Sequence, residues 1–134
     1  DRDELVNAYD NTIVETDHVL AATIEWLKRR AADHAPALVY MSDHGESLGE
    51  YGLFLHGLPY AFAPEAQTRV PFIAWVGDEL VARRRIDLAC MARRLDLPHS
   101  HDHLYLSVLG LVDVTTPTYR AALDAFAPCR TGRS

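Results

Sequence analysis

The stretch ALVYMSDHGESLGEYGLFLHGLPY, residues 37–60, joins a continuous apolar run to a loop that is rich in ionisable side chains and glycines. The apolar run, residues 37–41, is typical of a β-strand that is buried on both faces. Residues 42–60 carry two histidines, three carboxylates and four glycines. Carboxylate and imidazole are ligands that zinc takes in proteins, and glycine lets a backbone approach a bound group closely. A plain surface loop can have the same composition, so both interpretations stand at this point.

The segments on either side predict further helices and strands. Apolar side chains recur at helical spacing from Leu5 to Leu27, so residues 3–32 are predicted to form one amphipathic helix. A second apolar run at residues 70–76 predicts another strand, and we expect the two strands to be interior neighbours with the long helix across one face. Further helices are predicted at residues 79–95, from an N-cap at Ser100, and around residues 119–126. This order predicts part of a layered α/β domain.

Composition indicates a globular protein and excludes several classes of partner. The 134 residues are 49% hydrophobic, which suffices for one domain with a core. The 19 acidic and 13 basic residues give a formal charge of −6, which argues against nucleic-acid binding because no basic stripe can neutralise phosphates. No apolar run approaches the roughly 20 residues that span a bilayer. Cys90 and Cys129 lack metal-binding spacing, and they could pair or stay free.

Asp43 and His44 follow the first predicted strand, at the edge where α/β sheets bind ligands. Both side chains could reach one Zn²⁺ if the backbone turns sharply, and Gly45 permits such a turn. Taken alone, an Asp-His-Gly triplet is more often a turn in which Asp bonds to the backbone. Residues 47–50 fit a capping box, and His56 could be an ordinary surface histidine.

A longer set of residues favours the metal-loop interpretation. The set comprises Ser42-Asp43-His44-Gly45-Glu46-Ser47-Leu48-Gly49-Glu50, Gly52, Leu55-His56-Gly57 and Pro59-Tyr60, with Asn7 to Ile13 upstream and Ala63-Pro64, Gln67, Val70-Pro71-Phe72, Ser100-His101-Asp102 and Leu109 to Val114 downstream. It resembles the signature of the bacterial phosphoethanolamine transferases, enzymes of the alkaline phosphatase-like, sulfatase-fold superfamily that decorate lipid A. The resemblance covers nearly all of the chain and is far more specific than the triplet.

The resemblance implies a fold and a set of site residues. The expected fold is α/β, a partial alkaline phosphatase-like/sulfatase α/β/α sandwich over residues 1–130 with a disordered tail at residues 131–134. Asp43 and His44 are expected to be two ligands of a catalytic zinc ion. His56 is expected to bind the phosphoethanolamine group and to act in catalysis as a charge stabiliser or proton donor. The family completes the zinc site with a Glu and a nucleophilic Thr, and nothing in this chain matches them.

The resemblance also implies partners and a location. Phosphatidylethanolamine is the expected donor and a lipid A phosphate the expected acceptor, although a core sugar or a glucan stays open as acceptor. The expected location is the inner membrane, with the catalytic domain facing the periplasm. Asp1-Arg2-Asp3-Glu4 leads directly into the first predicted helix without an initiator Met, and no membrane helix of the family is matched. We therefore expect the C-terminal piece of a longer enzyme, inactive alone. Alternatives are a phosphoglycerol transferase, a sulfatase, or a non-catalytic zinc-binding fragment.

Two other patterns carry weaker signals. His99, His101 and His103 alternate along the chain and suggest a second metal site, but the resemblance places them around a helix start, where successive side chains diverge. A structural or substrate-side role is therefore favoured for these histidines. Residues 129–133 faintly resemble the sulfatase element Cys-x-Pro-x-Arg, but Thr131 replaces the Pro and the element follows the metal loop instead of preceding it. We reject this second pattern.

Overall fold

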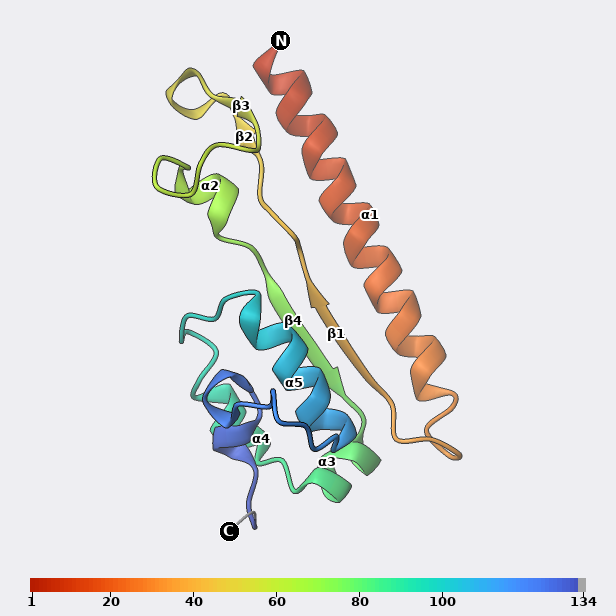
Figure 1. Ribbon diagram of the computed structural model, residues 1–134. Coiled ribbons are helices and arrows are strands. Elements are labelled where there is room, and N and C mark those ends of the chain that lie inside the picture. The colour runs from red at the N-terminus through yellow and green to blue at the C-terminus, as the bar shows by residue number, and fades with distance from the viewer. Residues whose placement is uncertain (133–134) are drawn as a thin grey trace. The chain divides into compact units, whose positions relative to one another are not determined.

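The computed structural model describes residues 1–132, which form two compact units (Figure 1). One unit comprises Asp1–Trp26 and Ser42–Pro71, and the other comprises Leu27–Met41 and the chain from Phe72 onward. The loop with the candidate metal ligands therefore belongs to the first unit, whereas residues 37–41 and residues 72–76 of the two predicted strands belong to the second. The content of short strands and helices is that of a partial α/β fold.

The first unit contains most of one long helix and a short hairpin. Its elements are α1 (Arg2–Lys28), β2 (Ser47–Leu48), η1 (Glu50–Gly52), β3 (Phe54–Leu55) and α2 (Glu65–Thr68). The predicted helix at residues 3–32 is confirmed, although it ends earlier, at Lys28. Acidic Asp3 and Glu4 in the first turn and Lys28 in the last turn complement the helix dipole. No residue of α1 is buried, and its packing across the sheet stays a prediction.

The second unit contains a two-stranded sheet and the remaining helices. Its elements are β1 (Ala37–Met41), β4 (Phe72–Val76), α3 (Asp78–Arg84), α4 (Leu88–Ala92), α5 (Asp102–Val112), η2 (Ala121–Leu123) and η3 (Ala127–Cys129). The two strands lie side by side and run antiparallel (Figure 1), with Ala37 opposite Val76 and Met41 opposite Phe72. The prediction that the two apolar runs are neighbouring strands is confirmed.

The prediction that both strands lie in the interior is wrong for the described residues. Within residues 1–132 the β1–β4 sheet has two strands, so each strand has a partner on one edge only. No residue of β1 or β4 is buried, and the Ile73 side chain is 41% exposed. Both runs are apolar on both faces, but within these residues neither strand is buried on both faces.

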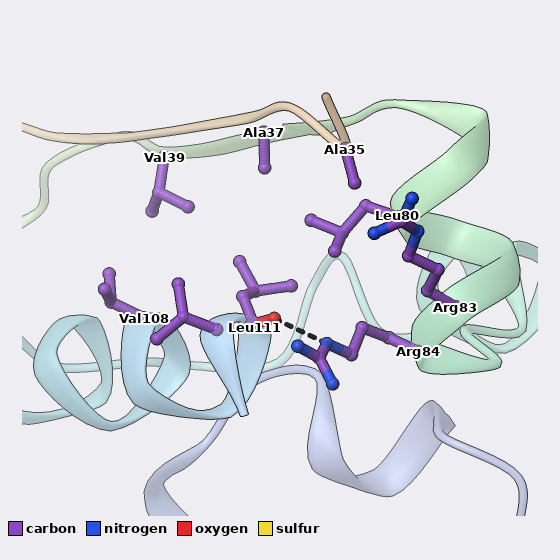
Figure 2. Close-up of a pocket in the computed structure, with 9 residues that line it drawn as sticks. Ala35, Ala37, Val39, Leu80, Arg83, Arg84, Val108 and Leu111 are labelled. Carbon is purple, nitrogen blue, oxygen red and sulfur yellow. Dashed lines mark hydrogen bonds between the residues drawn. The ribbon is translucent and has the colours of Figure 1, made fainter. Parts of the chain in front are cut away.

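The core of the second unit lies on one face of the sheet. Leu80, Ile86, Leu111 and Phe126 form its buried cluster, and Ala37, Val39 and Val76 of the strands pack against it. A pocket of about 490 Å³ opens between β1, α3 and α5 (Figure 2). Its walls are mostly aliphatic, and the Arg84 guanidinium beside it donates to the Leu111 carbonyl oxygen at 2.8 Å and pairs with Asp113. None of the predicted site residues lines this pocket.

Three helix predictions need correction. The segment predicted as one helix at residues 79–95 is two helices, because Arg85 adopts a left-handed conformation (φ 51°) that ends α3. Asp87 then caps α4 by accepting a hydrogen bond from the Cys90 backbone N–H at 2.9 Å. The helix expected from Ser100 begins at Asp102 without a side-chain cap. The helix expected around residues 119–126 is replaced by the 3₁₀ turns η2 and η3.

A buried ion pair and a disulfide hold the end of the chain. Asp124 and Arg130 form a salt bridge with side chains 0% and 5% exposed, and the Tyr119 hydroxyl donates to the same carboxylate at 2.6 Å. Cys90 and Cys129 form a disulfide, which resolves the alternatives that the sequence left open. Thr131 donates its backbone N–H to the Arg85 carbonyl oxygen at 3.0 Å. The rest of the expected tail, residues 133–134, lies outside the described residues.

None of the described helices combines the length and the apolar character that crossing a membrane requires.

The disulfide between Cys90 and Cys129 generates a stability prediction. It closes a loop with a sequence separation of 39, so opening it restores conformational freedom to the unfolded chain. We expect the double substitution Cys90→Ser, Cys129→Ser to lower the free energy of unfolding by about 2–4 kcal/mol, measured by chemical denaturation. Added reductant should destabilise the unchanged protein and leave the double variant as it is. An unchanged unfolding midpoint in the double variant would contradict this expectation.

Candidate metal centre

The β2–β3 hairpin places Glu46 opposite His56. Ser47 pairs with Leu55 and Leu48 with Phe54, so Glu46, just before β2, and His56, just after β3, leave the end of the ladder next to each other. The Nδ1 atom of His56 lies 3.1 Å from the Glu46 Oε2 atom. Because an ionised carboxylate only accepts hydrogen bonds, this contact places a proton on Nδ1 and leaves Nε2 of His56 free for another partner.

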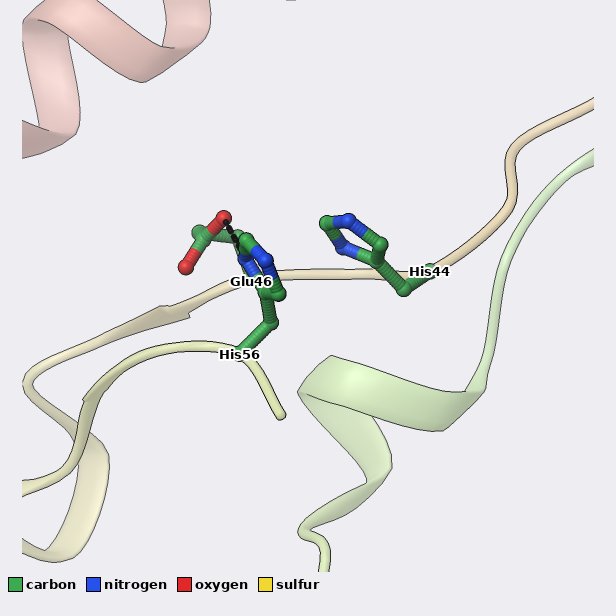
Figure 3. A group of neighbouring side chains, drawn as sticks. All are labelled: His44, Glu46 and His56. Carbon is green, nitrogen blue, oxygen red and sulfur yellow. Dashed lines mark hydrogen bonds and ion pairs between the residues drawn. The ribbon is translucent and has the colours of Figure 1, made fainter. Parts of the chain in front are cut away.

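His44 completes a three-residue cluster with this pair. Its ring stacks on the His56 ring, with centroids 3.7 Å apart and an interplanar angle of 27°. One ligand atom from each of His44, Glu46 and His56 lies within 4.8 Å of the others, and Figure 3 shows the three side chains converging from two segments of the loop. Imidazole nitrogen and carboxylate oxygen are donor atoms that suit zinc, although not every member of the cluster need be a ligand.

The second oxygen of Glu46 supports a bound cation. Its Oε1 atom is buried and has no hydrogen-bond partner among residues 1–132. A buried acceptor without a partner costs free energy, so such an atom in a native fold calls for a ligand or a functional reason. The cluster therefore fits a metal ion both by its donor types and by an acceptor that the protein itself does not satisfy.

Asp43 lies beside the cluster and is not one of its three members. Its Oδ2 atom is 3.8 Å from the His44 Nε2 atom, and its side chain is 89% exposed. Its other oxygen accepts a hydrogen bond from the His44 backbone N–H at 3.1 Å, which is the turn contact expected of a plain Asp-His-Gly loop. Asp43 and His44 are thus close neighbours, and their role as zinc ligands stays a prediction.

Gly45 allows the loop to approach α2 closely. Its backbone N–H donates to the Gln67 carbonyl oxygen at 2.9 Å. A Cβ atom on Gly45 would clash with the carbonyl oxygen of Ala66, so a residue with a side chain does not fit here without movement. This approach fixes the backbone between His44 and Glu46, the two residues on either side of Gly45.

Glu50 holds the turn of the hairpin. Its Oε2 atom accepts a hydrogen bond from the Leu48 backbone N–H at 2.7 Å, and its Oε1 atom lies 3.7 Å from the Arg2 guanidinium. Hydrogen bonds from the backbone N–H groups of Glu50 and Leu48 lower the pKa of the Glu50 carboxyl below its ordinary value of 4.5. The capping-box alternative at residues 47–50 is wrong, because the Ser47 hydroxyl is buried and bonded to Gln67 instead.

The weaker sequence patterns do not join this cluster. The His99 ring contacts Phe72 and His103 edge-on, with centroids 5.6 Å and 4.8 Å away, and all three residues lie in the second unit. No metal-ligand group that includes them is found among the described residues. Cys129 is in the disulfide with Cys90, which agrees with the rejection of the Cys-x-Pro-x-Arg pattern.

Glu46 and Gln67 are the residues that sequence reasoning missed. Both residues belong to the quoted motif. Glu46 could equally be a solvent-exposed acid of a plain loop, and Gln67 lies well after the other site residues in the sequence. The strands between Glu46 and His56 are two residues long each, so they show no alternation that could reveal the pairing.

Comparison with known proteins gives consistent results. A sulfatase family model matches residues 1–114. Phosphoethanolamine transferase EptA of Salmonella typhimurium is 43% identical over 130 residues, which are 96% of this chain and 24% of that protein. The present chain therefore spans about a quarter of that relative.

Solved structures also match nearly the whole chain. The soluble domain of lipooligosaccharide phosphoethanolamine transferase A from Neisseria meningitidis matches with a TM-score of 0.93 and 40% identity, over 98% of this chain and 40% of that one. The integral membrane protein of the same name matches with a TM-score of 0.92, over 25% of its chain. The C-terminal periplasmic domain of phosphoethanolamine transferase EptC from Campylobacter jejuni matches with a TM-score of 0.84 and 38% identity, over 41% of its chain.

Gly45→Ala should disturb the cluster selectively. The new methyl group must push the loop away from Ala66, so we expect lower zinc retention, measured by metal analysis after dialysis, and a loss of about 1–3 kcal/mol in stability. Gly52→Ala is the matched control. Gly52 has a left-handed φ of 73° but nothing within 4 Å of an added Cβ, so its substitution should cost stability without a loss of zinc. Equal zinc retention in both variants would contradict the assignment.

The Glu50 carboxyl should titrate below 4.5 when it is followed by NMR. Because its folded-state pKa is lowered, the support that it gives to the hairpin is present at neutral pH and is lost as the pH falls through the lowered value. Arg2→Ala should leave most of the shift, because the backbone hydrogen bonds are the larger cause. A Glu50 pKa at or above 4.5 in the unchanged protein would refute this account.

Proposed function

The chain belongs to the sulfatase family, and we propose that it is the C-terminal part of the catalytic domain of a zinc-dependent phosphoethanolamine transferase. The observation that carries the proposal is the convergence of His44, Glu46 and His56 in the loop that bears the family motif. The names of the relatives support the reaction type, since those relatives are phosphoethanolamine transferases. The remaining parts of the site would come from residues outside this chain.

Asp43 and His44 would hold the zinc ion, with Glu46 close enough to the imidazoles to contribute its unpaired oxygen. When bound, zinc would polarise a phosphoryl oxygen and lower the pKa of a coordinated hydroxyl. Residues 1–134 contain no match to the Glu and the nucleophilic Thr that complete the family's site. We therefore propose that this piece alone does not transfer phosphoethanolamine.

His56 would act on the substrate side of the site. Its contact with Glu46 holds a proton on Nδ1 and fixes the ring, so that Nε2 can bind or protonate an oxygen of the transferred group. The His56 side chain is 48% exposed, which leaves room for that partner. The stacked His44 ring limits the directions in which His56 can rotate.

The donor and acceptor follow from the same proposal. Phosphatidylethanolamine would supply the phosphoethanolamine group, and a lipid A phosphate would accept it, in agreement with the lipooligosaccharide in the name of the Neisseria relative. An inner-membrane enzyme with a periplasmic catalytic domain would bring both lipids within reach, and one relative is named an integral membrane protein. The Cys90–Cys129 disulfide supports an oxidising compartment such as the periplasm.

Substitutions in the full-length protein that contains this chain test the division of roles. We expect Asp43→Ala and His44→Ala to lose nearly all bound zinc and nearly all transfer from a fluorescent phosphatidylethanolamine, because each removes a metal ligand. His56→Ala should keep its zinc and slow the chemical step by roughly 10²–10⁴-fold, because it removes the acid or the charge stabiliser. Zinc content and single-turnover rates provide the two measurements.

His34→Ala is the matched control, since His34 is an exposed histidine outside the cluster. It should change neither zinc content nor rate. Full activity of His56→Ala, or loss of zinc from all three site variants alike, would show that His56 is assigned wrongly. Hydrolysis of sulfate esters without phosphoethanolamine transfer would instead favour a sulfatase.

A further inference from the structure

Gln67 is a buried polar residue at the centre of the loop that carries the candidate metal centre. It lies on α2 and is 6% exposed. A buried amide must find hydrogen-bond partners, and those of Gln67 come from outside its own helix. Its partners therefore show what this side chain holds in place.

The Gln67 side chain bonds to both strands of the hairpin. Its Nε2 atom donates to the Ser47 hydroxyl at 2.9 Å and to the Leu55 carbonyl oxygen at 3.1 Å. Its Oε1 atom accepts from the Leu58 backbone N–H at 3.4 Å. One amide thus connects β2, β3 and the loop that follows. A carboxylate or an aliphatic side chain could not replace it, because neither offers both the donors and the acceptor that these bonds use.

Each of these partners adjoins a member of the metal cluster. Ser47 follows Glu46, and Leu55 precedes His56. The backbone carbonyl of Gln67 also accepts from Gly45, which lies between His44 and Glu46. The hydrogen bonds of one residue therefore reach the chain beside all three members of the cluster.

We propose that Gln67 is a positioning residue for the transfer reaction, which acts by holding His56 and Glu46 in register. This inference rests on the proposed function, because it assigns to Gln67 an effect on the chemistry of that site. Gln67 does not touch the reacting groups. Its side chain sets the distance between the ends of the hairpin, and small errors in the position of a catalytic group are costly to rate.

The side chain and the backbone of Gln67 hold different members of the cluster. The hydrogen bond from the Gly45 N–H to the Gln67 carbonyl oxygen involves only backbone atoms. A substitution at position 67 that leaves the backbone in place therefore keeps this bond, and the segment that carries His44 stays fixed. The bonds to Ser47 and Leu55 do not survive the loss of the amide. A side-chain variant should therefore disturb the Glu46–His56 pair more than the zinc ligand His44.

A double-mutant cycle in the full-length protein tests this role. Gln67→Glu keeps the size and one acceptor but loses the two donated bonds. We expect it to lower kcat for transfer from fluorescent phosphatidylethanolamine by roughly 10–100-fold, with KM little changed and a much smaller loss of zinc than Asp43→Ala or His44→Ala causes. In a His56→Ala background the same substitution should cause almost no further loss, because a residue that acts through His56 has nothing left to position.

Ser47→Ala provides a milder second variant should Gln67→Glu fail to fold. It removes one acceptor of the amide and should lower kcat in the same direction, again without a further loss in the His56→Ala background. Thr68→Ala is the matched control, since within residues 1–132 its hydroxyl donates to the Pro64 carbonyl oxygen, at the start of α2. It should leave kcat unchanged. Losses that multiply in the double variants would overturn the positioning role.

Hydrogen exchange separates this proposal from the proposed function. Gln67→Glu should accelerate amide exchange in residues 46–58, which include the Leu58 N–H that bonds to Gln67, and Thr68→Ala should not. If the unchanged protein transfers no phosphoethanolamine but this exchange pattern is found, the proposed function fails and the structural part of the inference holds. Unchanged exchange in residues 46–58 of Gln67→Glu would overturn the inference itself.

Discussion

The hydrogen bond between the Gly45 N–H and the Gln67 carbonyl is the contact on which the candidate metal centre depends. It draws the loop after β1 against α2, closer than any side chain at position 45 would allow. His44 and Glu46 leave this point in succession, and the hairpin returns His56 to them. Position 45 therefore requires glycine because the backbone approaches its neighbour closely. The other glycines of the loop have a different role, since their conformational freedom lets the chain turn.

The elements with strong local signals could be predicted, and those decided by distant contacts could not. The strand at residues 37–41 and the long N-terminal helix follow from apolar runs and periodicity, which are local properties. The break at Arg85 depends on the Ile86 and Asp87 contacts with the end of the chain, including the bond from the Asp87 N–H to the Cys129 carbonyl oxygen at 2.8 Å. The burial of each strand depends on its neighbours in the sheet, which no single run of residues encodes.

The residues of the candidate site also fall into those that could be predicted from the sequence and those that could not. Asp43, His44 and His56 stand out because imidazole and carboxylate groups next to glycines suggest a metal loop. Glu46 has the same chemistry but is indistinguishable from a solvated acid until the hairpin pairs it with His56. Gln67 gives no chemical signal at all, since an amide becomes informative only when its burial and its partners are known. Candidate reactive residues can be recognised by type, whereas the residue that we propose positions them can be recognised only from the fold.

The Oε1 atom of Glu46 is a buried acceptor without a hydrogen-bond partner among residues 1–132, and such an atom lowers the stability of a fold. A buried polar atom without a partner costs about 1–3 kcal/mol, and an apolar side chain of similar shape would avoid that cost. The surrounding hydrogen bonds hold the carboxylate in place nevertheless, through Gln67, Ser47 and the hairpin register. A group that binds the protein only in its folded state stabilises that state. The lone pairs of the Glu46 Oε1 atom are therefore available to the metal ion that we propose for this loop.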